Sequence, residues 1–345
     1  GLAAHCYSAA QPHPNPPACE RRYAMIECYK TATAGSIERI EAPESGCWVN
    51  AIAPTPEERT WLEEELGVLP EFVRSALDDE ETSRIDYDED VNQTFVIVDY
   101  PVAPGEEGAP DARQYDTMPL SMVFIPEKSL FVTLGLYDNP ITRDMAAGRV
   151  RGVDTRFRTR FLLQILLRIS QLYLVYLRRI DRLSSATEEK LHASVRNEEL
   201  IQMLDLEKSL VYFSTSLKSD EVTLNKIMHG RIIPLYEDDQ DLLEDVLVEI
   251  HQAIEMCNIY SNTLSGTMDA FASIISNNLN IVMKVLSVIT IVMAIPNIVF
   301  GFYGMNVGLP FEGVPLLDNW AFPTLLAAVA CLIAAWIFKR KGMWH

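Results

Sequence analysis

Positive charge is scarce in this sequence. Its 345 residues carry 29 lysines and arginines against 48 aspartates and glutamates, which gives a formal net charge of -19 and a pI near 4.7. Proteins that bind nucleic acid need clustered Lys and Arg against the phosphates, so the composition excludes that class of partner. A cation suits the surplus of carboxylates better.

The sequence also lacks grouped metal ligands and common enzyme motifs. Its six cysteines are scattered, with no C-x-x-C pair and no histidine cluster nearby, so neither a disulfide framework nor a structural zinc site is indicated. It has no G-x-x-x-x-G-K-[ST] loop and no H-E-x-x-H, and His192, His229 and His251 stand alone. A membrane-anchored enzyme is therefore a remote alternative, and no ATP-driven step is indicated.

Two long apolar runs are present, Ile281–Tyr303 and Trp320–Phe338. Each is long enough to cross about 30 Å of hydrocarbon. Lys284 stands at the head of the first run and three basic residues follow the second, whereas the connecting segment Gly304–Asn319 has no Lys or Arg. The positive-inside rule then predicts a multi-pass protein of the cell's inner (plasma) membrane, with both termini cytoplasmic and the connector outside.

A stripe of small and polar residues follows the first run. Steps of four and three residues back from Gly301 trace one face of a helix. Its members are Gly301, Asn297, Ala294, Thr290, Ser287, Met283, Asn280, Ser276, Ser273, Asp269, Gly266 and Asn262. Polar groups in hydrocarbon need a partner or a water-filled cavity, so this face is predicted to line a hydrated path. The alternative is close packing of small residues against another helix.

The first run continues a longer helix. No proline lies between Leu235 and Pro296 and acidic residues fill the opening turns, so one helix is predicted over 236–303, roughly 100 Å long. This stalk carries a second, apolar stripe that predicts packing against neighbours over many turns. The stripe comprises Leu243, Leu247, Ile250, Ile254, Cys257, Leu264, Met268 and Phe271.

In the first half of the chain, the pattern of short strands and helices predicts a soluble domain. Residues 1–24 hold four prolines among polar residues and are predicted to be a disordered tail or one foreign to the protein. No secretory signal is found there, so the domain over 25–150 is predicted to be cytoplasmic and α/β. A hairpin loop is expected at Pro101–Pro110. The expected helices are Pro56–Leu66 and Pro70–Leu77, and the expected strands are Ile26–Lys30, Ile37–Ile40, Cys47–Ala51, Thr94–Tyr100, Met118–Ile125 and Leu130–Leu134.

Residues 151–235 predict an antiparallel pair of helices, Thr155–Ala193 and Asn197–His229. The apolar run Phe161–Leu177 resembles a membrane span in length. It is interrupted by Arg168 and two glutamines and repeats at helical spacing, so a buried core helix is predicted instead.

The sequence Tyr303-Gly304-Met305-Asn306, after Val282-Met283-Lys284-Val285-Leu286 and before a basic tail at 339–345, resembles the CorA family of magnesium transport proteins. The resemblance implies an α+β membrane protein that forms a homopentamer in the lipid bilayer. Each chain would have a cytoplasmic α/β funnel, a long stalk helix that becomes the pore helix, and a second transmembrane helix over 320–338. Two features depart from the family: Ala294 stands where a bulkier apolar residue is common, and the basic tail is short.

The resemblance also implies roles for single residues. Gly304, Met305 and Asn306 would form the outer selectivity ring. Positions along the pore would be Asn280, Leu286, Ala294 and Asn297, with Leu286 at the hydrophobic constriction. Because Mg²⁺ sheds water reluctantly, a ring of Asn306 carbonyls suits its hydrated form. In the connector 304–319, Glu312 and Asp318 are expected to attract cations.

Cytoplasmic Mg²⁺ is expected to act as a regulator as well as the transported ion. The acidic runs Asp78–Glu81 and Asp86–Asp90 are solvated faces or carboxylate ligands for a divalent cation. The family resemblance implies a regulatory ion between neighbouring chains, with Asp245 on the stalk. Its partner is expected among Asp86, Asp88, Glu89 and Asp90.

The expected function is passive uptake of Mg²⁺, with Co²⁺ or Ni²⁺ as further substrates, driven by the membrane potential. The alternative is a zinc transporter of the same superfold. Those relatives usually alter the middle residue of the triplet, so Met305 favours magnesium.

Overall fold

The computed structural model describes residues 26–32, 36–106, 114–193, 197–229, 232–305 and 320–341. The chain divides into two compact units, one within Gly1–Ser265 and one within Gly266–His345. The predicted tail 1–24 and residues 306–319 of the predicted connector lie outside the described residues.

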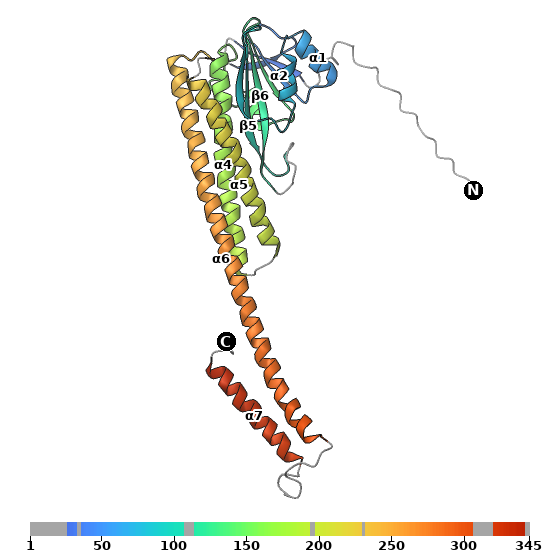
Figure 1. Cartoon of the computed structure of the whole chain (residues 1–345). Coiled ribbons are helices and arrows are strands. Elements are labelled where there is room, and N and C mark those ends of the chain that lie inside the picture. Colours follow the sequence, from blue (N-terminus) through green and yellow to red (C-terminus); the bar gives the residue numbers. More distant parts are fainter. Residues whose placement is uncertain are drawn as a thin grey trace, which may run out of the picture. The chain divides into compact units, whose positions relative to one another are not determined.

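A seven-stranded mixed sheet forms the centre of the first unit (Figure 1). The strand order is β2-β1-β3-β7-β6-β5-β4, in which only β3 and β7 pair in parallel. The strands are β1 (Ile26–Thr31), β2 (Ile37–Ile40), β3 (Trp48–Ile52), β4 (Arg84–Asp88), β5 (Gln93–Val102), β6 (Asp116–Ile125) and β7 (Leu130–Gly135).

Alternate residues of the central strands face opposite layers. Val49 and Ala51 of β3 belong to the apolar cluster under helices α1 (Pro56–Glu64) and α2 (Pro70–Ala76). Trp48, the residue before Val49, turns to the other face, where its ring packs at an angle of 53° against Phe161 with the centroids 5.1 Å apart. The period of two therefore places one apolar layer on each side of the sheet, as Figure 1 shows.

Helices α4 (Arg158–Ala193) and α5 (Asn197–His229) cover the second face. Tyr173 of α4 meets Phe213 of α5 edge to face, with ring centroids 5.2 Å apart, and both rings are fully buried. The most apolar stretch of α4 is 61% buried inside the protein. The prediction of a core helix at Phe161–Leu177 is confirmed.

Helix α6 (Glu237–Tyr303) runs unbroken through 67 residues, as predicted, and α7 (Ala321–Arg340) follows. The apolar stripe of α6 is buried in the first unit at Leu243, Ile250, Ile254, Cys257 and Leu264. Three helices, α4, α6 and α7, are long and apolar enough to cross a membrane among the residues searched. The apolar stretches of α6 and α7 are each only 6% buried, in contrast to α4.

Two elements differ from the sequence prediction. Strand β4 spans Arg84–Asp88 and overlaps the acidic run Asp86–Asp90, which was expected to be a solvated face or a ligand set; it pairs with β5 as an edge strand. Helix α3 (Pro140–Ala146) was not predicted at all. Strand β5 also continues through Pro101 to Val102, so the expected hairpin loop begins later. An edge tolerates charges and a proline's missing N–H, which hides such strands from pattern reading.

Two carboxyl groups lie between the sheet and α5: Asp220 is buried and Asp99 is half-buried. Asp220 is 2% exposed, and its Oδ1 accepts hydrogen bonds from the Ser83 hydroxyl and, at 3.0 Å, from the Asp99 backbone N–H. Its Oδ2 has no partner among the described residues. Burial, with the nearby Asp99 carboxylate, raises the pKa of Asp220 well above its ordinary value, and burial also raises the pKa of Asp99.

The raised pKa makes stability depend on pH. Since the folded protein holds this proton more tightly than the unfolded chain, its contribution is present below the unfolded value near 3.8 and is lost as pH rises toward the folded pKa. Asp220→Asn removes the buried charge and keeps the Oδ1 acceptor. We expect it to raise the Tm at pH 8 by about 4 °C, at roughly 2–4 °C per kcal/mol, and to change the Tm much less at pH 5.

Thermal unfolding of the full-length protein in detergent, followed by circular dichroism, measures both values. Asp181→Asn, an exposed aspartate on α4, serves as the matched control. A Tm that falls at pH 8 in Asp220→Asn would contradict a penalty from the buried charge.

Candidate functional site

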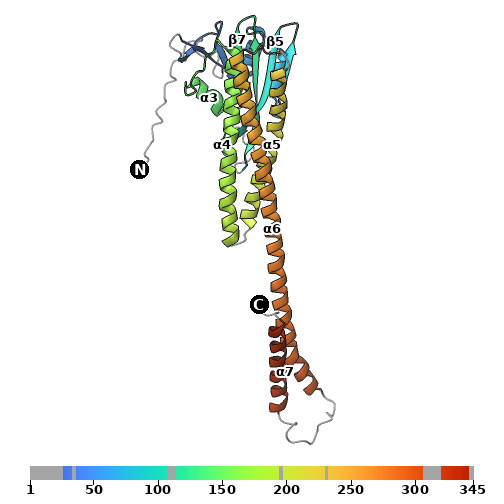
Figure 2. The ribbon, with the colours of Figure 1, turned by 90° about the vertical axis from the view of Figure 1, so that its left-hand side faces the viewer.

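Within the second unit, α7 contacts one face of α6 (Figure 2). The thiol of Cys331 lies 3.6 Å from the Val292 carbonyl oxygen, and the rings of Phe322 and Tyr303 lie 6.3 Å apart. On this side of α6, the buried or half-buried residues are Val288, Val292, Ile295, Val299 and Tyr303. They recur at steps of four and three and define the face that α7 covers.

The predicted polar stripe lies on the opposite face of α6. At about 100° per residue, its mean direction is roughly 150° around the helix from the face that α7 covers. In the apolar part of the helix, the exposed members of the stripe are Asn280, Met283, Ser287, Thr290, Asn297 and Gly301. Ala294 is half-buried. Leu286 at the edge of the stripe is 54% exposed. Within one chain, α7 therefore covers one apolar strip of α6. The polar stripe stays uncovered, as do flanking apolar residues such as Ile289, Met293 and Ile298.

The hydroxyl groups on this stripe bond to their own helix. Ser287 donates to the Met283 carbonyl at 2.7 Å, and Thr290 donates to the Leu286 carbonyl at 2.8 Å. Each hydroxyl proton is thus used inside the helix, and the oxygen lone pairs remain as acceptors on the outer surface. Together with the exposed Asn280 and Asn297 amides, the face offers neutral oxygen atoms, which suit a hydrated cation.

A proline inside α6 explains one of the contacts with α7. Pro296 has no N–H, so the Val292 carbonyl four residues earlier loses its usual helical donor. The Cys331 thiol supplies a weak donor to that oxygen. From the sequence, Cys331 was expected only to lie in the second apolar span. Pro296 is the signal that could have predicted its contact, because a proline leaves the carbonyl four residues earlier without a donor.

Helix α6 ends at the predicted triplet. Gly304 donates its N–H to the Phe300 carbonyl at 2.8 Å and closes the last turn. A side chain at Gly304 would come within 3.1 Å of that same carbonyl oxygen, so the close turn favours glycine. Met305 is 54% exposed. Asn306, Glu312 and Asp318 lie outside the described residues.

The predicted acidic sites stay apart within one chain. Asp269 and Asp245 are exposed on α6, and the described residues contain no cluster of three or more His, Cys, Asp or Glu side chains that could hold a metal ion. Asp86 is already paired with Arg84, whose Nε donates to it at 2.6 Å.

The rest of the acidic run closes the β4–β5 turn. Asp88 accepts backbone hydrogen bonds from Asp90 at 3.0 Å and Val91 at 3.1 Å, whereas Glu89 and Asp90 are exposed. Of the four predicted partners of Asp245, these two have the freest carboxylates.

Comparisons with known proteins agree with this arrangement. The family model for CorA-like Mg²⁺ transporter proteins matches residues 43–340. The chain is 26% identical to the cobalt/magnesium transport protein CorA of Methanocaldococcus jannaschii over 338 residues, which cover 92% of this chain and 99% of the relative.

Solved structures show the same fold. The complete structure of the CorA magnesium transporter from M. jannaschii aligns over 93% of this chain and 99% of its own, with a TM-score of 0.78 and 23% identity. The cytoplasmic domain of ZntB from Vibrio parahaemolyticus aligns over 74% of this chain and 97% of its own, with a TM-score of 0.56 and 14% identity.

The exposed stripe can be tested by thiol labelling in the membrane. Thiols react as thiolates, which form in water and not in hydrocarbon. We expect Ser287→Cys and Thr290→Cys to react with a small hydrophilic thiol reagent about tenfold faster than Val288→Cys, which α7 shields, or Ile289→Cys. The unsubstituted protein gives the background rate.

Mass spectrometry of the labelled protein reads the rates. If all four positions react alike, or if Thr290→Cys is as slow as Val288→Cys, the stripe is a packing surface and not a wet face.

Proposed function

Because the chain belongs to the family of CorA-like Mg²⁺ transporter proteins, we propose that it is a channel for passive uptake of Mg²⁺. The observation that carries the proposal is the polar stripe of α6 on the side opposite α7. A stripe of neutral oxygens at membrane depth needs water or other chains around it. Several copies arranged around an axis would enclose such a path, and the family resemblance implies five.

The helix end at Gly304-Met305-Asn306 is proposed as the selectivity ring. Mg²⁺ holds its water shell tightly, and neutral carbonyl oxygens can accept hydrogen bonds from that shell without removing it. A ring of full charges would hold the ion too strongly for release. The close contact at Gly304 favours a glycine where the chain leaves the helix.

The driving force is the membrane potential. A charge that crosses the membrane gains about 2.3 kcal/mol per 100 mV, so a divalent ion gains roughly twice that inward. This requires the orientation predicted from the basic residues, with both termini in the cytoplasm and the connector outside the inner membrane. Glu312 and Asp318 would then concentrate cations at the entrance.

Zinc transport is the second candidate. It is favoured by the structural similarity to the ZntB cytoplasmic domain. Met305 in the triplet favours magnesium. Uptake of Mg²⁺, Co²⁺, Ni²⁺ and Zn²⁺ into liposomes that contain the purified protein separates the two, because a zinc transporter should pass Zn²⁺ and exclude Mg²⁺.

We expect Asn306→Ala to lower Mg²⁺ uptake in the same liposomes by at least tenfold, because it removes the acceptor for the hydrated ion. Assembly, measured by size-exclusion chromatography, should not change. Asn319→Ala is a matched control in the same connector. Unchanged Mg²⁺ uptake in Asn306→Ala would contradict the proposal of a selectivity ring.

Cytoplasmic Mg²⁺ is proposed to close the channel by binding between neighbouring chains. Asp245 is exposed on the stalk, and no metal cluster forms inside one chain among the described residues, so the ligands would come from two chains. The exposed Glu89 and Asp90 are better candidates than Asp86, which Arg84 already engages. Carboxylates gathered across an interface repel one another, and a bound cation would relieve the repulsion and stabilise the closed state.

Limited proteolysis tests this regulation. We expect millimolar Mg²⁺ to protect the full-length protein against digestion, and Asp245→Asn to require several-fold more Mg²⁺ for the same protection. Asp241→Asn, an exposed aspartate one turn earlier on α6, is the matched control. The mechanism is ruled out if the digestion pattern is the same with and without Mg²⁺.

A further inference from the structure

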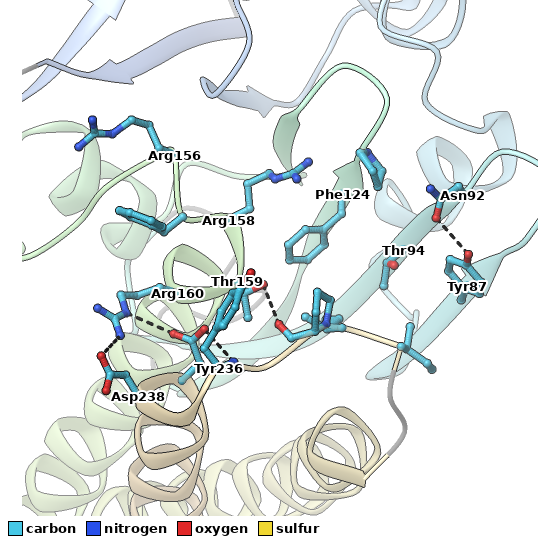
Figure 3. Close-up of a pocket in the computed structure, with 16 residues that line it drawn as sticks. Tyr87, Asn92, Thr94, Phe124, Arg156, Arg158, Thr159, Arg160, Tyr236 and Asp238 are labelled. Carbon is cyan, nitrogen blue, oxygen red and sulfur yellow. Dashed lines mark hydrogen bonds and ion pairs between the residues drawn. The ribbon is translucent and has the colours of Figure 1, made fainter.

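A cleft of about 930 Å³ lies in the first unit, at the N-terminal ends of two helices. Its walls come from the start of α4, the start of α6 and the strands β4, β5 and β6 (Figure 3). All of its residues precede residue 240, so it is separate from the stripe and the triplet. The proposed function gives it no role.

Three arginines line the cleft, and two of them are neutralised by carboxylates. Arg156 pairs with Asp154 at 2.6 Å. Arg160 pairs with Asp238 and Asp239, each at 3.2 Å, as Figure 3 shows for Asp238.

Arg158 is the exception. Its Nη1 is buried, and no group in the described part of the chain accepts a hydrogen bond from it. Burial lowers the pKa of this guanidinium, because desolvation penalises the charge, but an arginine side chain remains a cation at neutral pH. In a chain with a net charge of -19, a half-buried cation that no carboxylate neutralises is a specific feature.

Aromatic rings form much of the remaining wall. Phe157 is 61% exposed and Tyr236 is 76% exposed at the mouth, whereas Phe124 lies buried in the wall. On the strand side, Asn92 accepts a hydrogen bond from the Tyr87 hydroxyl at 3.0 Å through its Oδ1, which leaves its amide NH₂ to donate. Exposed aromatic side chains around a cleft are typical of a site that a flat apolar group covers.

We propose that this cleft binds a small organic anion with an aromatic body and one phosphate or carboxylate group. Because Nη1 is buried, the Nε and Nη2 edge of the planar Arg158 guanidinium is the one that would meet either head group with two parallel hydrogen bonds. The first turn of α4 lines the same space, and its free N–H groups add to the attraction for an anion. The aromatic body would cover Phe157 and Tyr236. Since Tyr236 immediately precedes α6, a bound anion would touch the start of the stalk helix.

Isothermal titration calorimetry on the full-length protein in lipid nanodiscs tests the proposal. Adenosine monophosphate, benzoate and inorganic phosphate are titrated separately, with EDTA present so that no divalent ion competes. We expect adenosine monophosphate or benzoate to bind, and Arg158→Gln to weaken that binding by at least about tenfold, the effect of losing a charge-assisted hydrogen bond. Arg182→Gln, an exposed arginine on the same helix, should bind as the unaltered protein does.

The pattern of binding decides the head group. Tighter binding of adenosine monophosphate assigns a phosphate, and tighter binding of benzoate assigns a carboxylate. The proposal is overturned if neither binds, as when a neighbouring chain fills the cleft, or if Arg158→Gln and Arg182→Gln behave alike. Inorganic phosphate binding as tightly as adenosine monophosphate would also overturn it, because the aromatic walls would then contribute nothing.

Hydrogen exchange of the unaltered protein gives a second measurement, for the case that Arg158→Gln does not assemble. Adenosine monophosphate or benzoate should slow exchange at 92–94, 156–160 and 236–239. No change at these segments would count against the proposal. Neither measurement depends on ion flux, so failure here leaves the transport proposal untouched, and failure of transport leaves this site intact.

Discussion

Hydrocarbon offers no hydrogen bonds, and this constraint organises the C-terminal unit. Every polar group on α6 at membrane depth must be satisfied inside the protein or by water. Ser287 and Thr290 donate to their own helix, and the Val292 carbonyl that Pro296 leaves without a donor accepts from the Cys331 thiol. What remains unsatisfied is the outer surface of one polar stripe, on the face away from α7. The described part of α6 thus gathers these exposed polar groups on a single face, the face that we propose as the wall of the ion path.

In the first unit, some polar groups are buried against protein. The Asp220 carboxyl enters the core with hydrogen bonds from Ser83 and the Asp99 backbone, and burial raises its pKa. Arg158 is a second buried polar group, and its partner is missing from the described part of the chain. The apolar layers on the two faces of the sheet supply most of the other buried side chains. A buried polar group without a partner lowers the stability of the fold. At Arg158 we propose that the unpartnered group serves to bind an anion in the cleft.

Pattern reading succeeded where one periodicity dominates. The unbroken α6, the buried α4, the strands at the centre of the sheet and the polar stripe all follow from runs of apolar residues at steps of two or of three and four. Prediction from periodicity failed where charged side chains break the alternation of a strand. Strand β4 carries Arg84, Asp86 and Asp88, which read as a solvated run because an edge strand exposes half of its side chains. Helix α3, of seven residues, is too short to show a period.

The sequence by itself determined the two apolar spans and the long helix that joins the first of them to the N-terminal domain. It also determined the stripe from Asn280 to Gly301 and, through Gly304-Met305-Asn306, the family. Each of these depends on neighbours along the chain. Only the tertiary structure decided that α7 covers the face opposite the stripe and that Arg84 engages Asp86. It also decided that Arg160 pairs with two carboxylates, whereas Nη1 of Arg158 has no partner among the residues that the structure describes. Those outcomes depend on residues far apart in sequence, and the packing of whole elements, not local periodicity, sets the distances between them.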